Sequence, residues 1–189
     1  MSKTSAPLIG IALMIGAMAA LPFIDMFAKI LGAAGLPIVL IVCARVGFGA
    51  LMTAPLAYRA VGKGMFRRAN PWFHVLRAAL FNLSTFTFFW SLKYLPLADS
   101  LSIFFVQPLV LTALSGWFFG ESVGLRRWAA VLIGFVGVLI IVRPGLVAFN
   151  LGTVFAFASG CCLAIYLALS RRIAGEMPAI VTTFQTSAL

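Results

Sequence analysis

The chain has 189 residues, of which 63% are hydrophobic and 10% are charged, and its formal net charge at pH 7 is +10. A soluble domain with this composition would have a largely apolar surface, so the composition excludes an ordinary water-soluble protein. The basic residues lie in short stretches between apolar segments and not along one face of a polar domain, which argues against nucleic-acid binding. We therefore predict an all-α integral membrane protein with several transmembrane helices.

Apolar runs long enough to span about 30 Å of hydrocarbon recur along nearly the whole chain. The first run resembles a secretory signal sequence, but it continues well past the small residues at 17–20, which favours an uncleaved helix. A last apolar run begins at Pro178 and is too short to cross within the sequence. The predicted membrane-spanning helices cover about residues 7–31, 37–58, 73–92, 97–119, 128–142 and 151–169.

The distribution of Lys and Arg predicts an orientation in the inner membrane. If the N-terminus is cytoplasmic and the helices alternate in direction, the outer loops hold only Lys93 and Arg143. His74 and Arg77 fall near the inner end of the third helix, where we expect them to snorkel to the interface. The remaining loop charges then lie inside, as the positive-inside rule requires: Lys3, Arg59, Lys63, Arg67, Arg68, Arg126, Arg127, Arg171 and Arg172.

The two ends of the chain show a weak internal similarity. Aligning Leu151 onward with Ile9 onward pairs Arg171 with Lys29, and we interpret both as helix-end anchors. The two segments would run in opposite directions through the membrane, which indicates an inverted-topology repeat. We predict an inverted-repeat helical bundle in which residues 1–146 form a complete five-helix repeat and residues 147–189 begin a second. Two apolar helices that each end in a basic residue can also align by chance.

Asp25 and Arg45 are charges within apolar runs. A charge at the centre of a membrane costs about 2.5–3.5 kcal/mol even on lenient insertion scales, so such residues pair, line a cavity or do both. At about 1.5 Å per residue, Asp25 lies about 9 Å and Arg45 about 12 Å from the outer boundary, so the two can pair across the first two helices. The sequence leaves two roles open for this pair, a substrate- or coupling-related one and a structural clamp.

The third and fourth helices carry further candidates. Asn82 and Thr85 share a helix face with Phe89, and Trp90 could form a cation–π wall for a ring-bearing or cationic substrate. The alternative for these polar residues is ordinary hydrogen bonding between helices. Gln107 precedes Pro108, which is expected to kink the fourth helix and free a backbone carbonyl, either as a static kink or at a site. Tyr166 is a candidate by its position alone.

Catalytic and metal-binding motifs are missing from the sequence. It contains no HExxH, no GxSxG and no GxxxxGK[ST] motif. Cys43, Cys161 and Cys162 form no CxxC pair, so we interpret them as packing residues. We therefore predict no enzymatic activity and no bound metal.

The stretch from Tyr94 to Gly145 resembles the end of an EamA domain, the repeat unit of the drug/metabolite transporter superfamily. The first charged helix, with Asp25 and Lys29, and Arg45 in the second are similar to members labelled as S-adenosylmethionine uptake transporters. The marks of the EamA domain are Pro108, the pair Gly120–Glu121, the basic-aromatic entry Arg126–Trp128, Gly134 with Gly137, and the exit Arg143–Gly145.

This resemblance implies ten helices in two inverted repeats, cytoplasmic termini, and secondary transport of a small metabolite by alternating access without a cofactor. The chain stops in what would be the seventh helix, so we expect either an N-terminal fragment with a missing C-terminal half or a homodimer. The metabolite would be S-adenosylmethionine, an amino acid or a cationic compound. The alternative is a non-transporting membrane subunit or scaffold that assembles through the glycine-rich faces at 116–120 and 134–137. The expected partners are the substrate and membrane lipid, with no nucleic acid.

Overall fold

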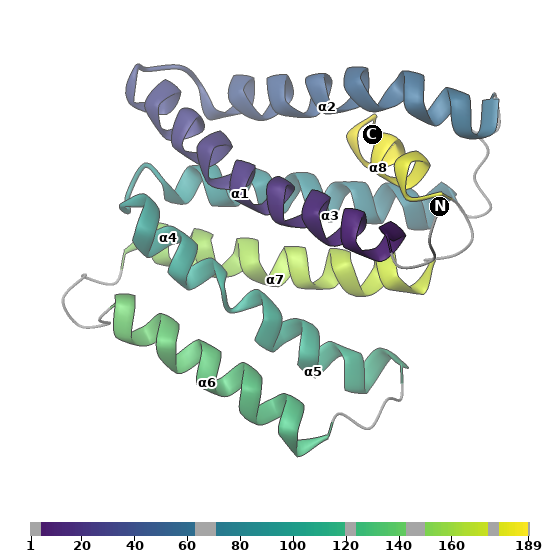
Figure 1. Cartoon of the computed structure of the whole chain (residues 1–189). Coiled ribbons are helices and arrows are strands. Elements are labelled where there is room, and N and C mark those ends of the chain that lie inside the picture. Colours follow the sequence, from purple (N-terminus) through teal and green to yellow (C-terminus); the bar gives the residue numbers. More distant parts are fainter. Residues whose placement is uncertain (1–4, 63–70, 120–123, 143–149, 174–177, 189) are drawn as a thin grey trace.

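The computed structural model describes residues 5–62, 71–119, 124–142, 150–173 and 178–188 (Figure 1). The ordered elements of these residues are all helices. They are α1 (Ser5–Ala33), α2 (Ile38–Val61), α3 (Pro71–Ser91), α4 (Leu97–Phe104), α5 (Gln107–Phe119), α6 (Leu125–Val142), α7 (Leu151–Arg172) and α8 (Ala179–Ser187).

The helices confirm the predicted class of an all-α membrane protein. Within the described residues, three segments are long and apolar enough to cross a membrane: Ile38–Val61, Leu97–Gly116 and Leu151–Arg172. Large apolar side chains on α1, α2 and α6 face away from the bundle, as Phe23, Phe48 and Ile133 illustrate with exposed fractions of 61%, 66% and 72%. Such a surface is stable only when acyl chains or other apolar partners cover it.

Local sequence signals explain where several helices begin. Pro37, Pro96 and Pro178 each stand immediately before a helix, at the start of α2, α4 and α8. Proline suits this position because its fixed φ is compatible with helix entry and its missing N–H has no intrahelical acceptor there. The start of α7 is capped differently: the Asn150 side chain accepts a hydrogen bond from the Thr153 backbone N–H at 3.2 Å.

The helices α3 and α7 lie side by side in the middle of the bundle (Figure 1). The pair α2 and α8 lies on one side of them, and α5 followed by α6 lies on the other. One apolar core joins α1, α2 and α3 through buried residues that include Ala28, Val42 and Phe89. A smaller core joins α2 to α8 through Ala57, Val181 and Phe184. The centre of the fold is therefore α3, which contacts helices from both ends of the chain.

Small residues let α7 approach its neighbours closely. A Cβ atom added at Gly160 would lie 2.7 Å from the Phe104 carbonyl oxygen and 2.8 Å from Val106 Cγ1. At Gly152 the added atom would lie 2.7 Å from Tyr94 Cβ. Helices in membranes associate through such small-residue contacts because lipid supplies no hydrophobic driving force between them.

The helix predicted over residues 97–119 is broken into α4 and α5. Phe104 is the last residue of α4, Phe105 and Val106 separate the two helices, and Pro108 lies in the first turn of α5. The prediction of a kink at Pro108 was therefore incomplete, because the chain stops being helical before the proline. Proline cannot donate a hydrogen bond to the Phe104 carbonyl four residues earlier, and that carbonyl instead faces Gly160 of α7.

The expectation that His74 and Arg77 snorkel to the interface is wrong. Their exposed fractions are only 4% and 2%, because α7 and α8 cover this part of α3. The Arg77 guanidinium donates to the Thr182 carbonyl of α8 at 2.8 Å and to the Ser170 hydroxyl of α7 at 3.3 Å. It also lies over the Tyr166 ring, with Cζ 5.6 Å from the ring centroid. Arg77 thus joins three helices.

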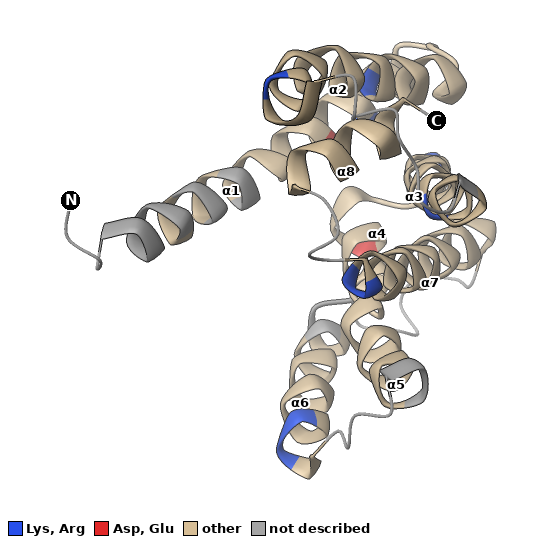
Figure 2. Cartoon of the chain, turned by 90° about the vertical axis from the view of Figure 1, so that its right-hand side faces the viewer, with Lys and Arg blue, Asp and Glu red and all other residues tan. Residues whose placement is uncertain are grey.

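One end of the bundle carries a concentration of basic side chains. At this end α2 and α7 end and α6 begins, and it faces the viewer in Figure 2. Arg59 lies in the last turn of α2 and Arg171 and Arg172 in the last turn of α7, while Arg126 and Arg127 open α6. These five arginines, which the positive-inside rule assigns to the cytoplasm, therefore lie at the same end of the fold.

Candidate substrate cavity

A cavity of about 280 Å³ lies where α1, α2, α3, α4 and α7 meet. Its two charged residues are Asp25 from α1 and Arg45 from α2, which face polar and aromatic residues of α3. The cavity therefore combines a carboxylate, a guanidinium, two hydroxyls and three phenyl rings in one space. The remaining lining residues are Leu21, Phe81, Ser84, Thr85, Phe88, Leu101, Phe104 and Leu163.

Asp25 and Arg45 interact electrostatically across this cavity. Within the described residues, however, no direct salt bridge joins them, so they are neighbours of opposite charge and not a closed ion pair. The Arg45 guanidinium also lies over the Phe89 ring, with Cζ 5.5 Å from its centroid. Two opposite charges that share a cavity without closing on each other leave hydrogen-bonding capacity for a ligand that carries both signs of charge.

The polar face predicted on α3 is divided between the cavity and the helix packing. Thr85 lines the cavity, although its hydroxyl donates to the Phe81 carbonyl at 3.1 Å. Asn82 lies outside the lining, and its buried Oδ1 has no hydrogen-bond partner among the described residues. Ser84 lines the cavity and is also bonded to Ser159 of α7, so one residue serves both the site and the scaffold.

Trp90 contacts protein groups and not the cavity. Its ring centroid is 5.1 Å from that of Phe86 and 6.2 Å from that of Phe155, and the Lys93 ammonium lies 4.8 Å from it. The cation–π partner that we expected to be a substrate is therefore Lys93. Lys93 follows Trp90 by three residues, so the sequence already contained an indication of this cation–π pair.

Gln107 and Tyr166 also lie outside the cavity lining. Gln107 is the first residue of α5, directly after the helix break. Tyr166 packs against Phe81, with ring centroids 5.1 Å apart, and lies under Arg77. Tyr166 thus packs against Phe81, a lining residue, without lining the cavity itself. Phe104 and Leu163 were not predicted for the site, because only the tertiary packing shows that α4 and α7 reach it.

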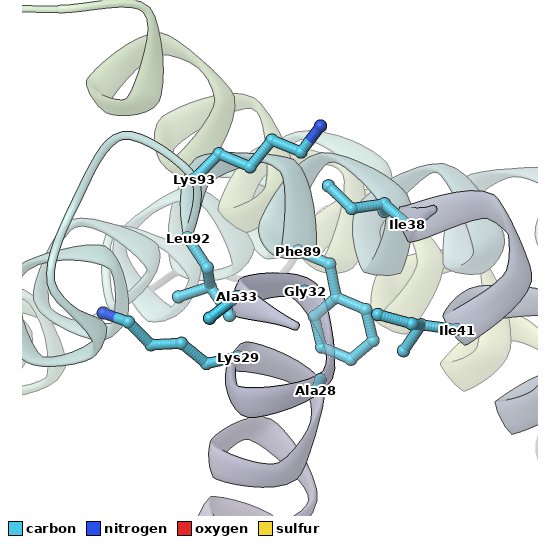
Figure 3. A pocket seen from close by; sticks show the side chains of 9 residues that line it. All are labelled: Ala28, Lys29, Gly32, Ala33, Ile38, Ile41, Phe89, Leu92 and Lys93. Carbon is cyan, nitrogen blue, oxygen red and sulfur yellow. The ribbon is translucent and has the colours of Figure 1, made fainter. Parts of the chain in front are cut away.

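A second pocket of about 230 Å³ opens near the ends of α1 and α3 (Figure 3). Its apolar wall includes Phe89 and Ile41, while the ammonium groups of Lys29 and Lys93 extend away from that wall in different directions. Lys29 Nζ donates to the Leu95 carbonyl at 3.4 Å, which ties the end of α1 to the turn after α3. Because the two ammonium groups do not converge, this pocket lacks an arrangement that would bind one anion. Arg171, the proposed counterpart of Lys29, is exposed in the last turn of α7.

Comparison with known proteins gives the family. The model of the EamA-like transporter family matches residues 8–143, which is well over half of the chain. The chain belongs to the EamA-like transporter family. This confirms the resemblance seen in the sequence, and it places the cavity in a chain whose family is one of transporters and not of enzymes. No solved structure matches this EamA protein.

Curated relatives of this EamA protein carry the names of two kinds of transporter. A riboflavin transporter of Vibrio cholerae is 30% identical over 104 residues, covering 54% of this chain and 35% of the relative. A riboflavin transporter of Rhizobium johnstonii is 32% identical over 98 residues, covering 52% and 32%. An S-adenosylmethionine uptake transporter of Rickettsia bellii is 29% identical over 89 residues, covering 47% and 31%. The matched part therefore spans about a third of the length of each relative.

Proposed function

We propose that this chain is part of a secondary transporter that moves a small metabolite across the inner membrane by alternating access, with a cytoplasmic N-terminus. The observation that carries the proposal is the cavity shared by Asp25 and Arg45 in a chain of a transporter family. Residues 1–146 would form the first repeat and residues 147–189 the beginning of the second. The cavity contains residues from both parts, since Leu163 of α7 completes its lining.

Two physical arguments support a transport site at this place. Ionisable residues within membrane-spanning segments are costly and typically mark substrate or ion pathways. Secondary transporters also build their sites near the membrane midplane, at the interface between repeats and beside discontinuous helices. Phe104 lines the cavity and is the last residue of α4, so the break between α4 and α5 borders the site.

The lining favours a zwitterionic, ring-bearing metabolite as the substrate. Arg45 can bind a carboxylate, Asp25 can bind an ammonium or sulfonium group, and Phe81, Phe88 and Phe104 supply aromatic faces. S-adenosylmethionine, the substrate in the name of the Rickettsia relatives, carries all of these groups. An uncharged flavin would leave Asp25 and Arg45 without charged partners, so we place riboflavin second despite the names of the other relatives.

Uptake by Asp25→Asn and Arg45→Gln variants of the full-length protein in proteoliposomes tests this function. Loss of one charge-assisted contact corresponds to about 1.5–3 kcal/mol, so we expect uptake of S-adenosylmethionine to fall about tenfold or more. Asp99→Asn is the matched control, because Asp99 lies in the first turn of α4 and outside the cavity lining. Normal uptake by an Asp25→Asn protein that inserts normally would contradict the proposed site. Uptake of riboflavin in place of S-adenosylmethionine, unchanged by the two substitutions, would make riboflavin the first candidate substrate.

The alternative of a membrane scaffold has one observation in its favour. Cβ atoms added at Gly134 and Gly137 of α6 would meet nothing within 4 Å, so this face is not used for close packing within the described chain. Gly120, from the other predicted glycine pair, lies outside the described residues. A scaffold would form oligomers that Gly137→Leu disrupts, and no substrate would be taken up by any variant.

A further inference from the structure

A groove between α5 and α6 is separate from the candidate substrate cavity. It has a volume of about 370 Å³, within the range of about 300–1,000 Å³ that is typical of small-molecule sites. The end of α4 contributes Phe105 and the first turn of α5 contributes Pro108, so the groove begins at the helix break. Every residue of its lining is apolar: Phe105, Pro108, Leu109, Ala130, Val131, Gly134 and Phe135.

Gly134 keeps this groove open. A Cβ atom at this position would meet no heavy atom within 4 Å, so the space beside the α6 backbone is empty of protein. A groove without polar groups does not bind water well, so it favours an apolar occupant. Within a membrane that occupant is either a hydrocarbon chain or another helix.

Charge at one end of the groove distinguishes between these two occupants. Arg127 precedes Ala130, Val131 and Gly134 by three, four and seven residues, so it lies on the same face of α6 as the groove. Arg126 and Arg127 are exposed, and neither side chain has a hydrogen bond or salt bridge within the described part of the chain. They stand at the basic end of the bundle, at the start of α6, which has the blue of Lys and Arg in Figure 2. The helices α5 and α6 contain no acidic residue.

We propose that the α5–α6 groove binds one anionic phospholipid, with an acyl chain along the groove and the phosphate at Arg126 and Arg127. A phospholipid combines an apolar chain for the groove with an anionic group for the arginines one turn away on α6, and basic pockets between transmembrane helices bind such headgroups. A second copy of the chain is the poorer occupant, because a copy with 14 basic and 4 acidic residues would be repelled by the same arginines. The site does not depend on the proposed transport function.

Native mass spectrometry of the purified full chain in detergent, titrated with phosphatidylglycerol or phosphatidylcholine, tests the proposal. We expect one phosphatidylglycerol to bind at least tenfold more tightly than phosphatidylcholine. The double variant Arg126→Gln/Arg127→Gln should lose most of this preference, since each basic residue near the surface contributes to the attraction. Gly134→Leu should reduce binding of both lipids by filling the groove, and the open space around Gly134 lets the variant fold.

Two control variants make the same chemical changes elsewhere. Arg171→Gln/Arg172→Gln removes two arginines from the same end of the bundle but from α7, and Gly47→Leu fills open space beside α2. Both controls should bind phosphatidylglycerol as the unmodified chain does. Equal binding of the two lipids, or equal losses in test and control variants, would overturn the proposal. A Gly134→Leu variant that converts a dimer into a monomer without a change in lipid binding would identify a second copy as the occupant.

Discussion

The interface between α3 and α7 differs in its chemistry from the junction of α1 and α2 with α3. Between α3 and α7, the Ser84 and Ser159 side chains bond to protein across the interface. Small residues of α7 also approach the turn after α3 and the break between α4 and α5 closely. At the α1–α2 junction, Asp25 and Arg45 share a cavity without a direct salt bridge. The first region is closed by its own contacts, while the second leaves polar capacity for another molecule.

This difference suggests separate roles for the two regions: the α3–α7 contact stabilises the fold, and the junction with α1 and α2 forms the candidate binding site. The α3–α7 contact joins the first part of the chain to the segment that we propose as the second repeat, and it is the part that must hold its geometry. The cavity lies against the same α3 face and uses Ser84, which is fixed by that contact. A binding site needs a rigid support and polar groups that are free to contact a ligand. Here the packed α3–α7 pair gives the support, and Asp25 and Arg45 give the polar groups.

The largest expected effect is at Gly160, where α7 meets the break between α4 and α5. A side chain there would meet the Phe104 carbonyl and Val106, so Gly160→Leu should destabilise the protein by about 3 kcal/mol. Gly134→Leu is the matched control, because its added atoms enter open space. Unfolding midpoints in mixed detergent measure both. Similar midpoints for the two variants would show that α7 is not tightly packed against the break between α4 and α5.

A smaller effect is expected at Arg77, which joins α3 to α7 and α8. Arg77→Lys keeps the buried charge but loses the planar fork that reaches the Thr182 carbonyl and the Ser170 hydroxyl, so we expect a loss of about 1–2 kcal/mol. Amide hydrogen exchange in α8 should rise more than that in α2. The same substitution at exposed Arg59 should change stability by less than about 0.5 kcal/mol. Equal effects at the two sites would show that Arg77 does not tie the three helices together.

Arg77 also shows what the sequence could and could not predict. The membrane class follows from apolar runs whose length matches a bilayer, and this property is local in the sequence. The burial of Arg77 is not local, because α8 covers it from more than 100 positions away. Likewise, Pro108 predicts a disturbance in its helix, but the close approach of Gly160 decides where the carbonyl of Phe104 points.

For the candidate site, the depth argument brought Asp25 and Arg45 to the same level, and the structure places both at one cavity. The argument from helix faces was less informative, since Thr85 lines the cavity and Asn82, three residues earlier on the same face, does not. A face extends along the whole helix, whereas a cavity is only about two turns long. Only the positions of α4 and α7 decide which part of the face is left uncovered.

The smallest expected effect is at the hydrogen-bonded serines between α3 and α7. Ser84 Oγ donates to the Ser159 carbonyl at 2.9 Å, Ser159 Oγ donates to the Ser84 carbonyl at 2.7 Å, and the hydroxyl oxygens are 3.1 Å apart. Such bonds within membranes average about 0.6 kcal/mol in double-mutant cycles, because the separated helices find other partners. A cycle of Ser84→Ala and Ser159→Ala should therefore give a coupling near that value in unfolding free energy. A coupling of zero would mean that the paired hydroxyls add nothing to the packing of α3 against α7. Uptake that falls in Ser84→Ala but not in Ser159→Ala would separate the role of Ser84 in the cavity from its role in the scaffold.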